Sequence, residues 1–98
     1  MIDFVGINAA ALAALPDLLR QWLPDGRQRK NEWLALNPRR ADHHAGSFQI
    51  NMRTGKWADF ATGDKGGDVI SLAAFLSGIG QAEAARNLAS MLGVPYEQ

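Results

Sequence analysis

The sequence contains no cysteine, and this absence excludes several kinds of site. Disulfide bonds, thiol nucleophiles and thiolate zinc sites all require cysteine side chains. The two histidines, His43 and His44, are adjacent, so they lack the spacing that places two imidazoles on one helix face. We therefore expect histidines in a solvated loop, no bound metal and no cofactor. The lack of disulfides fits a reducing compartment, and we expect a cytoplasmic protein.

Long apolar runs are also missing. No stretch approaches the ~20 apolar residues that a membrane span requires, and the N-terminal residues lack the basic and apolar regions of a signal peptide. A membrane partner is therefore not expected. The length of 98 residues suits a single domain. Within it we distinguish an N-terminal helical segment at 1–26, a β-ribbon at 27–65 and C-terminal helices at 66–98.

The chain has no net charge, but its charges are unevenly placed. Residues 27–65 hold eight of the ten basic residues and four acidic ones, which gives this segment a charge of +4. The flanking segments, 1–26 and 66–98, each carry −2. Such asymmetry suggests an anionic partner. On charge alone, a solvated face of mixed charge is the more common explanation.

Three segments of the middle third are predicted to be strands, namely residues 32–36, 47–52 and 56–60. The second alternates most clearly, with Phe48 and Ile50 facing inward and Gln49 and Asn51 facing outward. The loop before the third strand is short and offers Gly55 for a positive φ, which is typical of a hairpin.

The first 26 residues predict a helix that Asn8 caps and Pro16 interrupts. Because the proline ring clashes with the carbonyl four residues earlier, we expect a kink or two abutting helices. Four apolar side chains fall on one helical stripe: Leu12, Leu15, Leu19 and Trp22.

Residues 66–98 predict two antiparallel helices. Asp68 is placed to cap the first, and Gly93 and Pro95 end the second. The order of a helix, three strands and two helices indicates an α+β domain. We expect a small three-stranded antiparallel sheet flanked by the N-terminal helix and the C-terminal helical pair.

Acidic side chains do not form a catalytic constellation. Asp59, Asp64 and Asp68 fall on a strand, a loop and a helix cap, which argues against a two-metal nucleotidyl-transfer centre. The glycine-rich stretch at residues 62–68 has neither the Gly-Lys-Ser/Thr triplet of a P-loop nor a GxGxxG fingerprint. We interpret it as a strand-to-helix corner, and we expect no enzymatic activity.

Two aromatic rings, Trp33 and Trp57, lie on predicted strands close to basic residues. Rings on a sheet beside arginines and lysines can stack on unpaired bases. In a domain of this size, either ring taken singly is more often part of the core.

The segment 37–92 resembles the zinc-ribbon N-terminal domain of bacterial and phage DNA primases. In that family a Cys-Pro-x-His motif precedes a strand beginning Ser-Phe, and a hairpin then leads to Cys-x-x-Cys, a Gly-Gly-Asp turn and helices. The corresponding stretches here are NPRR at 37–40, SFQI at 47–50, GGDVI at 66–70 and EAARNLA at 83–89. The stretch at 54–68 looks like a zinc-free variety found at the front of primase-helicases of phages and plasmids.

In this resemblance all four metal positions are replaced, by Asn37, Arg40, Phe60 and Gly63. A zinc ribbon derives much of its folding free energy from its metal. Packing must supply that stabilisation when the ligands are absent. We expect Trp57, Phe60 and Phe48 to do so together with the apolar faces of the helices.

The resemblance implies a non-catalytic role in template recognition during DNA replication and primer synthesis by a phage or mobile element. Single-stranded DNA, or RNA, and a primase polymerase or helicase domain are the partners that it implies. Tryptophan 57 or 33 would stack on a base, and five cations would line the strand-and-loop face: Arg39, Arg40, Arg53, Lys56 and Lys65.

The alternative is a protein–protein interaction module that keeps the fold but binds neither metal nor nucleic acid. The zero net charge and the alanine-rich helices favour this interpretation. Such a module would oligomerise or capture a partner through its helical face.

Overall fold

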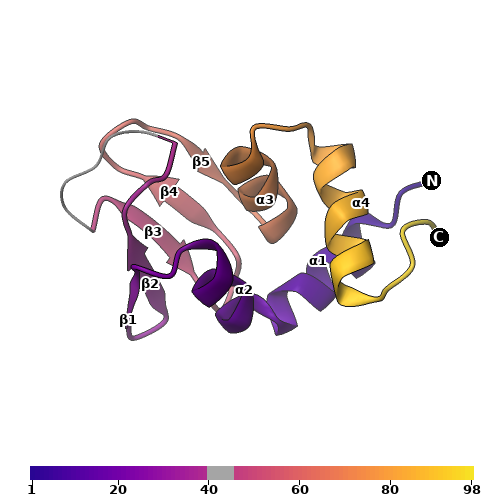
Figure 1. Cartoon of the computed structure of the whole chain (residues 1–98), viewed down its shortest axis with the longest axis horizontal. Coiled ribbons are helices and arrows are strands. Elements are labelled where there is room, and N and C mark those ends of the chain that lie inside the picture. The colour runs from indigo at the N-terminus through magenta and orange to yellow at the C-terminus, as the bar shows by residue number, and fades with distance from the viewer. Residues whose placement is uncertain (40–45) are drawn as a thin grey trace.

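The computed structural model describes residues 1–39 and 46–98. Arg40, His43 and His44 therefore lie outside the described residues, and so do the predictions made for them. Figure 1 shows the sheet toward one end of the molecule and α1 and α4 toward the other, where both termini lie. The helices are α1 (Phe4–Ala13), α2 (Leu15–Trp22), α3 (Val69–Ser77) and α4 (Gln81–Leu92), and the strands are β1 (Arg27–Arg29), β2 (Glu32–Ala35), β3 (Phe48–Asn51), β4 (Trp57–Asp59) and β5 (Lys65–Gly66).

The strands form one antiparallel sheet in the order β1-β2-β3-β4-β5. The expected α+β class is confirmed, and the three predicted strands correspond to β2, β3 and β4. The two outer strands were not predicted. All three residues of β1 are exposed, and β5 has only two residues, so neither carries an apolar alternation that could reveal it.

The β3–β4 connection is the expected hairpin. The Asn51 carboxamide oxygen Oδ1 accepts from the backbone N–H groups of Arg53 and Thr54, at 2.9 and 3.0 Å. Gly55 follows at φ 81°, a conformation that a side chain would strain. The hairpin thereby fixes the register of β3 on β4, in which Ile50 pairs with Trp57.

The N-terminal segment forms two abutting helices, as Pro16 predicted, and the proline lies in the first turn of α2. The predicted cap was wrong. Asp3 caps α1 through a hydrogen bond from the Gly6 N–H, while Asn8 lies inside α1. Asn8 instead accepts from the Ile70 N–H at 3.0 Å, so it serves the first turn of α3 across the interface between the two helices.

Helices α3 and α4 begin and end as expected. Asp68 caps α3 by accepting from the Ser71 N–H at 2.8 Å, and Ser71 completes a capping box. Gly78 and Gly93 end the two helices in the left-handed conformation, which favours glycine.

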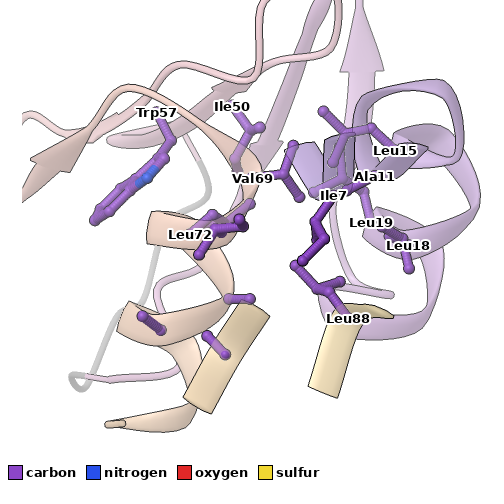
Figure 2. Packing of buried hydrophobic residues seen from close by; sticks show 14 of the residues in the cluster. Ile7, Ala11, Leu15, Leu18, Leu19, Ile50, Trp57, Val69, Leu72 and Leu88 are labelled. Atoms are coloured by element: carbon purple, nitrogen blue, oxygen red, sulfur yellow. The ribbon is translucent and has the colours of Figure 1, made fainter. Parts of the chain in front are cut away.

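The core lies between one face of the sheet and the helices. Figure 2 shows Ile50 and Trp57 projecting from the strands toward the helical side chains, including Val69 and Leu72 of α3. Phe48 is buried beside Trp57, with the two ring centroids 6.1 Å apart. The packing roles predicted for Phe48 and Trp57 are confirmed.

The packing role predicted for Phe60 is wrong, because its side chain is 71% exposed. Phe60 follows Asp59, which is buried at the end of β4. Since successive side chains of an extended chain alternate between faces, Phe60 points away from the core.

Candidate nucleic-acid interface

The sheet has two faces of different character, and the register separates them. Directly paired residues of antiparallel strands project to the same face. Ala35, Phe48, Ile50 and Trp57 project toward the helices and belong to the core. The residues between them project to the opposite face, which we call the open face.

The open face is cationic at its edges and carries both polar and apolar side chains at its centre. One row crosses all five strands through paired residues: Arg27, Leu34, Gln49, Ala58 and Lys65. With neighbouring strands about 4.8 Å apart, its cationic ends are separated by about 19 Å of sheet. Of the five, Leu34 is buried although it is not part of the main core.

A second row of paired residues lies two residues farther along the strands, on the same face. Arg29 pairs with Glu32, and Glu32 pairs with Asn51. The Asn51 N–H donates to the Lys56 carbonyl at 2.7 Å, which extends the row to Lys56 beyond the end of β4. Among the described residues of these two rows, the open face therefore presents four exposed basic side chains, Arg27, Arg29, Lys56 and Lys65, and one carboxylate, that of Glu32.

An exposed aromatic ring adjoins these cations. The Phe60 N–H donates to the Ser47 carbonyl at 2.8 Å, so the β3–β4 ladder continues past β4 and places Phe60 on the open face. A shallow hollow of about 200 Å³ lies beside the ring. Its lining includes Glu32, Gln49 and Lys56.

Among the predicted site residues, three lie on or beside the open face. Lys56 lines the hollow, Lys65 ends the first row, and Arg53 is exposed in the β3–β4 turn. Arg39 lies elsewhere, because its guanidinium is against Gly78 at the end of α3. A cation there interacts favourably with the carbonyl end of a helix, which is a sufficient structural role for it.

The two tryptophans predicted to stack on bases project to the helical side. Trp57 is 6% exposed, and its indole N–H donates to the Ser71 hydroxyl at 2.9 Å. Trp33 is half-buried, and its indole N–H donates to the Leu23 carbonyl at 3.1 Å. Both rings therefore pack with the core, which was the alternative to base stacking. Neither ring faces the cations of the open face.

Sequence reasoning missed Arg27, Arg29 and Phe60 as candidate site residues. A signal was present for each. The Arg-x-Arg spacing of residues 27–29 puts both guanidinium groups on one face of an extended segment. Alternation from the inward-facing Trp57 puts Phe60 on the same face as Ala58.

The three aspartates considered for a metal centre have different structural roles. Asp59 is buried on the helical face, Asp68 caps α3, and Asp64 accepts a hydrogen bond from the Thr62 hydroxyl in an exposed loop. Within residues 1–39 and 46–98, no three His, Asp or Glu side chains are grouped so that they could hold a metal ion. No helix in these ranges is both long and apolar enough to cross a membrane.

A scan against protein-family models finds no match for the chain, and a search of curated proteins finds no relative.

Proposed function

We propose that this chain is a non-catalytic, primase-type domain that binds single-stranded nucleic acid on the open face of its sheet. The role would be template binding in the DNA replication or primer synthesis of a phage or mobile element. The observation that carries the proposal is the composition of this face, with exposed cations at both edges and an exposed aromatic ring beside them. The resemblance of segment 37–92 to primase zinc ribbons supports the replication context.

Each component of the open face suits a different part of a single strand. Arg27, Arg29, Lys56 and Lys65 can contact successive phosphates, because long cationic side chains displace the counterions of a polyanion. Phe60 can stack on a base, and such stacking contributes about 1–3 kcal/mol per base. A duplex hides its base faces, so the ring favours an unpaired strand.

The test is a titration of a labelled oligothymidylate by fluorescence anisotropy over a series of salt concentrations. A single strand that contacts four cations should lose affinity with a log–log slope of about −3. Intrinsic tryptophan fluorescence is a poorer readout, because Trp33 and Trp57 face the helices. Binding that does not depend on salt, or that is equally strong for a duplex of the same length, would contradict the proposal.

A second candidate function is self-association through the helical side, and one observation favours it. An apolar groove of about 420 Å³ lies between α2, α3 and α4, with the half-exposed Met91 at its rim. Light scattering tests this candidate. A concentration-dependent dimer that Met91→Glu dissociates would support it, and a monomer at all concentrations would exclude it.

A further inference from the structure

The hollow on the open face has a specific hydrogen-bonding character, which is set by the residues around it. Its lining includes Glu32, Gln49, Asn51, Lys56 and Phe60. At about 200 Å³ it is smaller than the ~300–1,000 Å³ clefts that enclose drug-sized ligands. It therefore suits one planar ring, and the exposed phenyl ring of Phe60 offers that ring a stacking surface.

Each of the two amides donates one hydrogen bond within the protein. The Gln49 Nε2 donates to the Gly46 carbonyl at 2.8 Å, and its Oε1 receives no hydrogen bond from the residues that the structure describes. The Asn51 Nδ2 donates to the Glu32 Oε1 at 3.3 Å, while the Asn51 Oδ1 accepts from two backbone N–H groups of the β3–β4 turn. Asn51 therefore links Glu32 to the β3–β4 turn.

One wall of the hollow presents hydrogen-bond acceptors. An ionised carboxylate only accepts hydrogen bonds. Glu32 uses one oxygen for Asn51, and its Oε2 receives no hydrogen bond from the residues that the structure describes. Together with the Gln49 Oε1, the Glu32 carboxylate makes this wall of the hollow a site for ligand N–H groups.

Guanine is the nucleobase that matches such a wall. Its Watson–Crick edge carries two adjacent donors, the N1–H and the N2 amino group, which can both donate to one carboxylate. Adenine and cytosine carry one amino group next to an acceptor nitrogen, which would face the carboxylate unfavourably. Thymine and uracil carry one N–H between two carbonyl oxygens.

We infer that the hollow is a guanine-selective subsite, in which Phe60 stacks on the base and Glu32 accepts from its N1–H and N2 groups. This inference rests on the proposed function, because the subsite would hold one base of the bound strand. Glu32 shares its row with two cations, Arg29 beside it and Lys56 on the far side of Asn51. These cations offset the repulsion between the carboxylate and the phosphates of the strand.

The test compares oligothymidylates that carry one guanine, inosine, adenine or cytosine at the centre, with anisotropy as the readout. We expect guanine to be bound about tenfold more tightly than adenine or cytosine, which is the discrimination of one good bidentate pair. Inosine lacks the N2 amino group and should lose most of this preference. The ligand comparison needs no protein variant, so it does not depend on the folding of a mutant.

Glu32→Gln assigns the preference to its residue. The variant presents a donor as well as an acceptor, so guanine should lose its advantage while plain oligothymidylate binds as well as before or more tightly. Glu83→Gln on α4 removes the same charge far from the sheet and should leave the guanine preference intact. A preference that survives Glu32→Gln would overturn the role of Glu32.

The outcomes separate this inference from the function on which it rests. Equal, salt-dependent binding of all four oligonucleotides would overturn the guanine subsite and leave single-strand binding in place. The absence of binding to any of them would overturn both.

Discussion

The side-chain amide of Asn37 donates to the carboxylate of Asp59 at 2.8 Å, and both residues are buried. Asn37 follows β2, and Asp59 is the last residue of β4. The Asn37 Oδ1 also accepts from the Arg39 N–H, and the Asp59 Oδ1 accepts from the Ala61 N–H, each at 2.8 Å. The pair therefore joins the two chain segments that leave the sheet after β2 and β4.

This position agrees with the proposed relationship to primase zinc ribbons. In that relationship Asn37 stands at one metal-ligand position, and Asp59 directly precedes Phe60 at another. A hydrogen-bonded pair would then join two loops that a metal ion joins in the ribbon. Phe48 and Trp57 pack in the core between the sheet and the helices.

We predict that Asn37→Ala lowers the free energy of unfolding by about 1–3 kcal/mol, because it removes a donor from a buried carboxylate. Urea unfolding measures the change. Asn87→Ala is the matched control, since Asn87 is exposed on α4 and alanine is the better helix former. Equal stabilities of the two variants would show that the buried pair contributes nothing.

A chelator should leave the thermal unfolding midpoint unchanged, and added zinc should not raise it. In the proposed relationship to primase zinc ribbons, all four metal-ligand positions carry other residues in this sequence. A ligand that binds only the native state would raise the midpoint in proportion to its saturation. A midpoint that falls on chelation would contradict the account of a fold held without metal.

Gly66→Ala should destabilise the fold by about 1–3 kcal/mol, the usual cost of overpacking. A Cβ at residue 66 would collide with the Trp57 indole and with the Ser71 hydroxyl that accepts from it. Gly67→Ala is a neighbouring control, because a Cβ there meets no atom within 4 Å. Denaturant unfolding of both variants distinguishes a local collision from a general intolerance of alanine in this turn.

Asp3 should contribute a pH-dependent part of the stability. Hydrogen bonds from the Gln98 side chain and from the Gly6 N–H hold the pKa of the Asp3 carboxyl below its ordinary value of 3.8. Since the folded-state pKa is lowered, this stabilisation is present above the ordinary pKa and is lost as the pH falls through the lowered one.

The stability difference between the natural protein and Asp3→Asn should therefore be constant near neutral pH and shrink below pH 3.8. Urea midpoints measured over an acidic pH series give this difference. A difference that does not change with pH would mean that the two hydrogen bonds do not favour the charged form.

Phe60→Ala should weaken single-strand binding by about 1–3 kcal/mol, the contribution of one stacked base, and leave the unfolding free energy nearly unchanged. Phe4→Ala is the control, because Phe4 is a partly exposed phenylalanine on α1. If both variants bind as the natural protein does, the ring of Phe60 takes no part in recognition.

Much of the fold follows from local sequence. The alternation at residues 47–52 predicts β3 and its buried face. Pro16 predicts the break between α1 and α2, and Asp68 predicts the start of α3. The hydrogen bond from the Ile70 N–H to Asn8 could not be predicted from local sequence, because the two residues are 62 positions apart and meet only in the packed helices.

The candidate site was harder to predict than the fold. Basic residues were assigned to one surface because they are close in sequence, but Arg39 lies at the end of α3, away from Lys56 and Lys65. Which cations share a face depends on the strand register, and β1 and β5 are too short to reveal theirs. The tryptophans, chosen as aromatic rings on strands, face the core instead.

The most direct test of the central claim is to map backbone amide chemical shifts while an oligothymidylate is added. We predict that the largest changes fall on the open face, at Arg27, Gln49, Ala58, Phe60 and Lys65, and that they diminish with added salt. Changes confined to the groove between α2, α3 and α4, around Leu76 and Met91, would contradict single-strand binding by the sheet.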